Sequence, residues 1–198
     1  MSNPDTARCF YTVMRAEINQ HLQIVNQVYT LYLAGTSALF AGSMNKDGNY
    51  NLLLLIPFLS LGAANMLVSH ERAIGSIAAY CARELDKFLS EEKDSVVQWD
   101  RSESIERFKS GHYASNRAGA LTLVVIPGLA ALLLNGFKTL RALSWSLPLD
   151  KVDNLIKLIA WILCAVCLYR AASLISETAQ FRKELSEVPN QPTLGPSS

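Results

Sequence analysis

Apolar windows with little or no charge alternate with strongly polar segments along this chain. The hydrocarbon core of a bilayer is crossed by about 20 consecutive, mostly apolar helical residues. In one such window Lys157 and Arg170 lie toward the two ends, where long side chains reach the headgroups. The pattern predicts an all-α, polytopic membrane protein with four transmembrane helices. We expect these helices at residues 22–44, 52–69, 118–137 and 154–175.

Two other interpretations of these windows are weaker. A soluble bundle would need four unusually apolar helices within 198 residues. A cleaved signal peptide would need a short segment before its apolar run and a small-residue cleavage site after it. The segment before residue 22 is too long for this, and it contains acidic as well as basic side chains: Asp5, Arg8, Arg15 and Glu17.

The first two windows join amphipathic segments that continue the helical pattern outside the membrane. Residues 1–21 read as a cytosolic amphipathic helix, because apolar side chains recur there at three- and four-residue spacing. This stripe comprises Phe10, Met14, Ile18, Leu22, Val25 and Tyr29. A second stripe follows the second window and comprises Ile74, Ile77, Ala78, Cys81, Leu85 and Phe88. We expect helices 1 and 2 to extend into a cytosolic helical layer, with the two stripes packed on each other.

The distribution of Lys and Arg predicts the orientation, because cytoplasmic loops carry an excess of both. With the N-terminus inside, most of these residues fall in 1–21, 70–117 and 176–198. The outside segments hold Lys46, Lys138, Arg141 and Lys151. Both termini are therefore expected in the cytoplasm, and the protein in the cell inner membrane.

The segments between and after the windows have their own expected forms. Residues 70–117 form a cytosolic helical loop, in which 100–110 read as a short helix that ends at Gly111. Residues 138–153 read as an external interfacial loop. The tail is expected to be disordered from about residue 188, where it becomes rich in Pro, Ser and Gly.

The composition disfavours several functional classes. The net charge is +1 and no basic cluster has interleaved aromatic residues, so direct nucleic-acid binding is not expected. The centres of the windows hold no charged side chain, which counts against proton-coupled transporters and intramembrane hydrolases. The sequence has no phosphate-binding Gly-rich loop, nucleophile elbow or zinc-ligand spacing. Cys164 and Cys167 lie in an apolar window and are expected to pack there. We expect no enzymatic activity, no cofactor and no metal.

Small residues and prolines mark places where helices can pack closely or bend. Ala34, Ala38 and Gly42 are spaced four apart, which permits close helix approach in lipid. The sequence leaves open whether this row packs within one chain or between protomers. Pro57 and Pro127 lie inside the second and third windows and can kink those helices.

A group of polar residues is expected at the inner surface of the membrane. Glu17 and His21 are four apart before the first window, and His70, Glu71 and Arg72 follow the second. Together these side chains could bind a metal or an anionic headgroup. Interfacial hydrogen bonding is the simpler interpretation, and the sequence favours it.

Aromatic and apolar side chains stand among charges in the cytosolic loop. Trp99, Ile105 and Phe108 are the candidate residues for docking a partner protein. They could instead lie at the membrane interface or cover the stripe of the second helix.

The layout of the chain resembles a known family. The runs "LYLAGTSALFAG" and "LLLLIPFLSLGAANMLVSHERAIGSIAAYCARELDKFL" look like those of small bacterial membrane proteins, in which an amphipathic helix, two spans and a cytosolic helix precede two further spans. The layout, from about Arg15 to Ile175, is similar to the four-span membrane subunits of Kiwa anti-phage systems, which work with a cytosolic DNA-binding partner. The resemblance implies a sensor or effector at the inner membrane, and it assigns no functional residue.

The sequence therefore predicts a non-enzymatic inner-membrane subunit that oligomerises and docks a cytosolic partner, with antiviral defence as the expected process. Its expected partners are the lipid bilayer, further copies of itself and a cytosolic protein. One alternative is an oligomeric ion channel or membrane-permeabilising pore. Another is a membrane enzyme acting on lipid, with Glu17, His21, His70 and Glu71 as its site.

Overall fold

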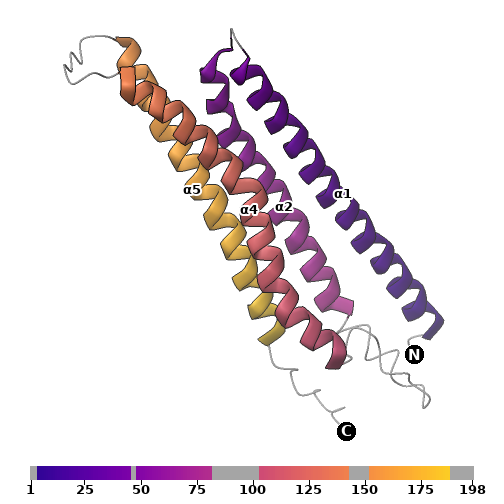
Figure 1. Ribbon diagram of the computed structural model, residues 1–198. Helices are drawn as coiled ribbons and strands as arrows, with labels where there is room; N and C mark the ends of the chain where they lie inside the picture. The colour runs from indigo at the N-terminus through magenta and orange to yellow at the C-terminus, as the bar shows by residue number, and fades with distance from the viewer. Residues whose placement is uncertain (1–3, 46–47, 82–102, 143–151, 188–198) are drawn as a thin grey trace.

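The chain folds into long helices in a computed structural model, which describes residues 4–45, 48–81, 103–142 and 152–187 (Figure 1). The described residues are all-helical. The helices are α1 (Pro4–Met44), the 3₁₀-helix η1 (Tyr50–Leu54), α2 (Leu55–Tyr80), α4 (Glu103–Ala142) and α5 (Val152–Glu187).

Among the described residues, three helical segments are long and apolar enough to cross a membrane. They are Tyr50–Tyr80, Ala118–Phe137 and Leu155–Thr178. These segments coincide with the second, third and fourth apolar windows and indicate a membrane protein. The window at 22–44 is helical within α1 but is not among the three. Its crossing of the bilayer therefore stays a prediction.

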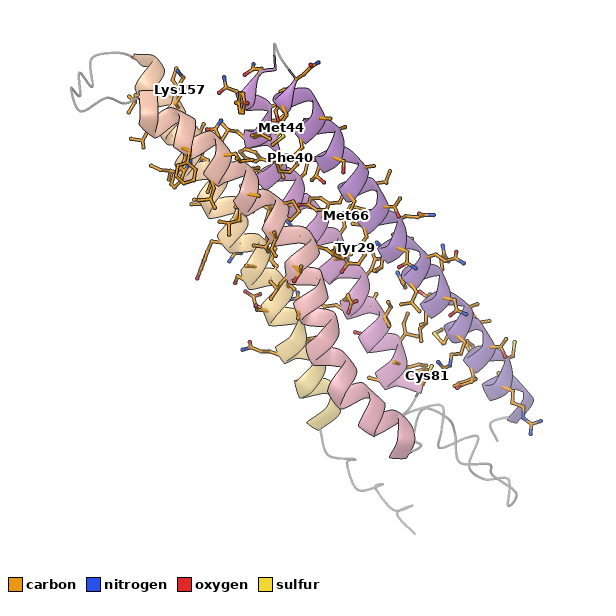
Figure 2. All side chains as sticks on the ribbon, in the orientation of Figure 1. Tyr29, Phe40, Met44, Met66, Cys81 and Lys157 are labelled. Carbon is orange, nitrogen blue, oxygen red and sulfur yellow. The ribbon has the colours of Figure 1, made fainter. Side chains whose placement is uncertain are left out.

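Helix α2 lies at the centre of the arrangement and contacts α1, α4 and α5. In Figure 1, α1 and α5 lie on opposite flanks of α2 and α4. Helices α1 and α2 run in opposite directions, side by side. Figure 2 shows Met44 near the turn that joins them, Tyr29 and Met66 midway along, and Cys81 at the far end of α2.

The largest buried cluster lies where α1, α2, α4 and α5 meet. Buried positions on α1 recur at steps of three, four and seven residues, which keeps one face toward a neighbouring helix. The cluster comprises Val25, Val28, Tyr32, Ala63, Ala64, Leu67, Val124, Ala171 and Ile175. Large apolar side chains on the outer faces of α2, α4 and α5 are exposed in the single chain, as expected for contact with lipid. They include Phe58, Met66, Leu129, Leu133, Ile159 and Ile162.

The buried face of α1 only partly follows the predicted stripe. Ile18 and Val25 are buried as expected, whereas Phe10 and Leu22 are exposed. Successive steps of four residues drift around a helix with 3.6 residues per turn, so this stripe leaves the contact face. On α2, Cys81 is buried as the second stripe predicts, and Leu85 and Phe88 lie outside the described residues.

The polar segments are more helical than expected. The predicted helix end at Gly111 is wrong, because α4 runs without a break from Glu103 through that glycine to Ala142. At the other end of the chain, α5 continues past the apolar segment to Glu187. The helices α1, α4 and α5 therefore all extend well beyond the apolar part of the bundle, toward the end that holds both termini (Figure 1).

Candidate functional site

Two histidines join α1 and α2 where these helices leave the apolar part of the bundle. The Nδ1 atoms of His21 and His70 lie 2.8 Å apart, with ring centroids separated by 5.1 Å. One nitrogen must carry the proton and the other must accept it, because a neutral imidazole has one donor and one acceptor. The contact is compatible with two neutral rings or with one imidazolium. It is incompatible with two imidazolium rings, whose Nδ1–H groups would face each other.

A carboxylate stands next to this pair. The Glu17 Oε1 atom lies 4.0 Å from Nε2 of His21, one helical turn away on the same helix. Glu17 therefore approaches one ring nitrogen of His21, Nε2, while the other, Nδ1, contacts His70.

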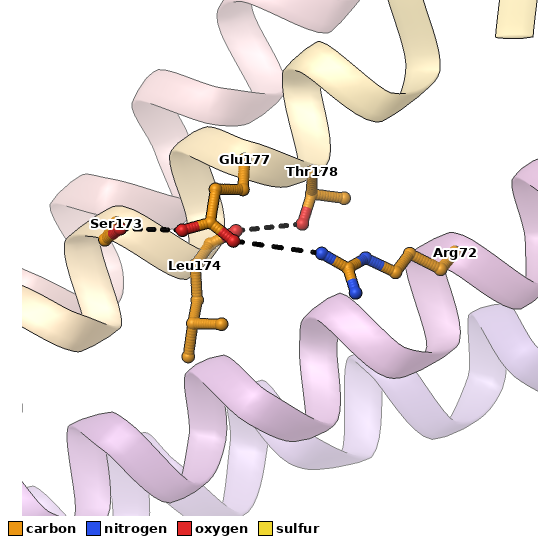
Figure 3. A network of polar contacts seen from close by, with 5 residues as sticks. All are labelled: Arg72, Ser173, Leu174, Glu177 and Thr178. Carbon is orange, nitrogen blue, oxygen red and sulfur yellow. Dashed lines mark hydrogen bonds and ion pairs between the residues drawn. The ribbon is translucent and has the colours of Figure 1, made fainter. Parts of the chain in front are cut away.

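Arg72 does not join this group and turns toward α5 (Figure 3). Its Nη2 atom lies 4.0 Å from Oε2 of Glu177, and Ser173 Oγ donates to Glu177 Oε1 at 2.8 Å. The guanidinium carbon lies 5.9 Å from the centre of the Phe181 ring. Since both charged side chains are about half exposed, the ion pair contributes at most about 1 kcal/mol.

The predicted inner-surface cluster thus forms two separate contacts. Two steps along a helix rotate the side chain by about 200°. His70 therefore points toward α1, and Arg72 points toward α5 on the opposite flank. Glu71 lies between them in sequence, is partly buried and has contacts of its own.

Within the described parts of the chain, no group of three or more His, Cys, Asp or Glu side chains is placed to hold a metal ion. The His21–His70 pair supplies two nitrogens that already contact each other. The geometry fits a helix-to-helix hydrogen bond, which is the simpler of the two interpretations that the sequence allowed.

A buried polar junction joins three helices near the middle of the bundle. The Tyr32 hydroxyl donates to the Val124 carbonyl oxygen at 2.8 Å and lies 2.9 Å from Ser60 Oγ. Ser60 Oγ also lies 3.0 Å from the Ile56 carbonyl oxygen of its own helix. Each hydroxyl donates one proton and can accept from the other, so the two protons serve two of these three contacts at a time.

The junction lies where α4 is interrupted by proline. Pro127 is inside α4 and lacks an N–H group, which disturbs the hydrogen-bond ladder over the preceding turn. The carbonyl that Pro127 leaves without its usual donor is that of Leu123, and Tyr32 donates to the carbonyl of the following residue, Val124. The residue after Pro127, Gly128, is in close contact with two helices: an added Cβ would overlap Leu168 Cδ2 and lie 2.9 Å from Ser60 Oγ.

The predicted packing row on α1 is exposed in the single chain, although its last member lies near a neighbouring residue. Ala34, Ala38 and Gly42 are all exposed. An added Cβ at Gly42 would lie 3.8 Å from Leu52 Cδ1, an ordinary contact. The two alanines therefore do not pack within this chain, and packing between protomers remains the open alternative.

The predicted docking residues are described only in part. Ile105 and Phe108 lie in the helical backbone of α4, and their side chains are outside the described set. Trp99 lies outside the described residues altogether.

Sequence reasoning missed Glu177 and Tyr32 as contact residues. A signal for Glu177 existed, because Arg72 and Glu177 each follow an apolar window and so lie at a similar depth with opposite charge. Tyr32 gave no comparable signal, since its partner carbonyl belongs to the backbone of a helix far along the chain.

No family model, no curated protein and no solved structure matches this chain.

Proposed function

We propose that this chain is a non-enzymatic inner-membrane subunit that oligomerises and docks a cytosolic protein. The observation that carries the proposal is the shared direction of the helical extensions. Helix α1 begins at Pro4 and α4 at Glu103, whereas the apolar segments begin near Leu22 and at Ala118. At about 1.5 Å per residue, the extensions are roughly 22–27 Å long. A helical platform of this length is suited to holding a partner at the membrane surface.

The side chains on the α1 extension support a docking role. Phe10 is 51% exposed in the single chain. It belongs to the polar segment before the first apolar window, where a large apolar side chain would otherwise face water. Exposed apolar side chains of this kind are typical of protein contact surfaces. Ile105 and Phe108 on α4 and Trp99 before it extend the proposed surface on sequence grounds.

The proposed orientation in the membrane and the proposed biological process rest on the sequence. The excess of Lys and Arg in segments 1–21, 70–117 and 176–198 supports placing the extensions in the cytoplasm. We assign the subunit to anti-phage defence because its layout of windows resembles that of Kiwa membrane subunits. In this proposal α1 is the fourth membrane-spanning helix, since it packs along the apolar length of α2.

Purification from native membranes in a gentle detergent tests the proposal. A cytosolic protein should co-purify at a fixed ratio with an oligomer of this chain, as measured by mass spectrometry and particle mass. Phe10→Asp should reduce the recovered partner several-fold. Met66→Ala, on the exposed face of α2 within the apolar segment, is the matched control and should leave recovery unchanged. Recovery of the chain without any stoichiometric partner would contradict the docking role.

An oligomeric pore is a second candidate, favoured by one observation. Asn26, Gln27, Thr30 and Ser37 are all exposed on α1 beside the apolar segment of α2. Uncharged polar side chains of this kind can line a water-filled path. Conductance of liposomes that contain the purified protein tests this candidate, and the absence of conductance with and without the partner would remove it.

A further inference from the structure

The outward face of α1 differs in chemistry from every other outward face of the described bundle. Its exposed positions follow alternating steps of three and four residues from one end of the helix nearly to the other. We call this line the outward seam. It comprises Cys9, Val13, Ala16, Gln20, Gln23, Gln27, Thr30, Ala34, Ser37 and Ala41. All ten are exposed in the single chain, and none is charged.

Much of the outward seam lies at the depth of the apolar segments. Helix α1 runs beside α2 from the His21–His70 contact, at 2.8 Å, to the neighbourhood of Gly42 and Leu52. The α2 residues between these contacts belong to an apolar segment that can cross a membrane. Seam residues from Gln23 to Ala41 therefore share the depth of the hydrocarbon core.

Lipid is a poor environment for such a face. The exposed faces of α2, α4 and α5 carry Leu, Ile, Phe and Met, whereas the seam carries Gln, Thr, Ser and Ala. Burying an amide in hydrocarbon without a hydrogen-bond partner costs several kcal/mol on transfer scales, about 4–8 for cyclohexane. Small residues and side-chain amides are the features that drive helix association in membranes. This surface is therefore built to contact another helix.

The spacing of the seam residues also favours contact with another helix. A repeat of 3.5 residues keeps a seam facing a partner helix when two helices wind around each other. The outward seam holds this repeat through the apolar part of α1 and into the polar extension at Ala16, Val13 and Cys9. A single contact that runs along both the apolar part and the polar extension of α1 explains why the outward seam has no charged residue in either part.

We propose that the outward seam binds the outward seam of a second copy of this chain, with the two α1 helices parallel and in register. Copies share one orientation in a membrane, so the symmetry axis runs along the membrane normal and each seam residue meets its own counterpart. Charged residues would repel their counterparts in such a contact, and the seam has none. A Gln amide carries both donors and an acceptor, so Gln23 and Gln27 can pair with themselves. Ala34 and Ala41 permit close approach of the backbones.

This inference rests on the proposed oligomerisation and assigns it a surface. It takes Ala34, from the predicted small-residue row, as part of a contact between protomers. It also accounts for why α1, unlike the other three long helices that the structure describes, is not among the segments apolar enough to cross a membrane: two of its sides contact protein in this arrangement.

Cysteine cross-linking in native membranes tests the contact. In a parallel pair the two Cys9 thiols lie across the axis from each other, while Cys81, Cys164 and Cys167 are buried. A short bismaleimide should give a homodimer with the wild type and none with Cys9→Ser. In the Cys9→Ser chain, Ala34→Cys should form an oxidative homodimer several-fold faster than Leu129→Cys, which is the control on the exposed face of α4. Retaining the buried cysteines keeps the packed core intact.

The outcomes separate this inference from the proposed function. Equal cross-linking at positions 34 and 129 would overturn the seam contact, as would a Cys9 cross-link to a different protein. A multimeric particle that retains its cytosolic partner but gives no seam cross-link would also overturn it and leave the proposed function standing. A monomer without a partner would contradict both. Seam-specific homodimers from positions 9 and 34 would support the contact.

Discussion

The Tyr32 hydroxyl lies 2.9 Å from Ser60 Oγ, and through this contact α1 is fixed to α2 at the middle of the bundle. The same hydroxyl donates to the Val124 carbonyl oxygen of α4 at 2.8 Å. Three helices thus share one buried pair of hydroxyl groups. Because the junction lies inside the apolar core, water cannot substitute for either partner once one is removed.

Replacing Tyr32 with Phe removes the donor to Val124 and keeps the aromatic ring. We expect the free energy of unfolding in mixed micelles to fall by about 0.5–1.5 kcal/mol, the usual net contribution of a hydrogen bond. Tyr169→Phe is the matched control, because Tyr169 is 72% exposed on α5 and should change stability little. Equal losses in the two variants would argue against the junction.

Gly128 is a position of close approach between α4 and its neighbours. Gly128→Ala places a methyl group against Leu168 Cδ2 and Ser60 Oγ, so one of these side chains must move. Overpacking of this kind costs about 1–3 kcal/mol. Gly62→Ala should be neutral or slightly stabilising, since nothing lies within 4 Å of its added Cβ and Ala has the better helix propensity. A similar midpoint of thermal unfolding for both variants would show that the close approach is absent.

The His21–His70 contact should appear as coupling between the two positions. We expect a double-mutant cycle with His21→Ala and His70→Ala to give a coupling free energy of about 0.5–1.5 kcal/mol. A cycle of Arg72→Gln and Glu177→Gln should give less than about 1 kcal/mol, because those side chains are half exposed and their attraction is screened by salt. Coupling in the histidine cycle that is indistinguishable from zero would contradict the contact.

The apolar windows were enough to predict three of the helices that can cross a membrane, because length and hydropathy determine that property residue by residue. The rotation of each helix was harder to predict. Phe10 and Leu22 fit a plausible stripe and are exposed, since small differences in spacing decide which face meets the neighbour. The continuation of α4 through Gly111 shows a second limit, because a single glycine weakens a helix by about 1 kcal/mol and does not always end it.

For the candidate site too, the sequence predicted what depends on position along the chain and missed what depends on how the helices pack. The places of His21 and His70 beside the first two apolar windows predicted that they lie at a similar level, and their Nδ1 atoms lie 2.8 Å apart. The separation of Arg72 from the histidines depends on which neighbour occupies each flank of α2. That arrangement is set by packing of the whole bundle, for example at Gly128, and has no local sequence signal.

Asn135 offers a test of the opposite end of the bundle. Its side-chain Nδ2 donates to the Tyr50 carbonyl oxygen at 3.0 Å and so connects α4 to η1, and the side chain is buried. Asn135→Ala should lower the free energy of unfolding by about 0.5–1.5 kcal/mol through loss of this bond. Asn65→Ala is the control, since the Asn65 amide is exposed and donates to the Leu61 carbonyl of its own helix. Removing that exposed amide should be neutral or stabilising in lipid. Greater destabilisation by Asn65→Ala than by Asn135→Ala would show that the exposed amide, and not the buried one, makes the contact that matters for stability.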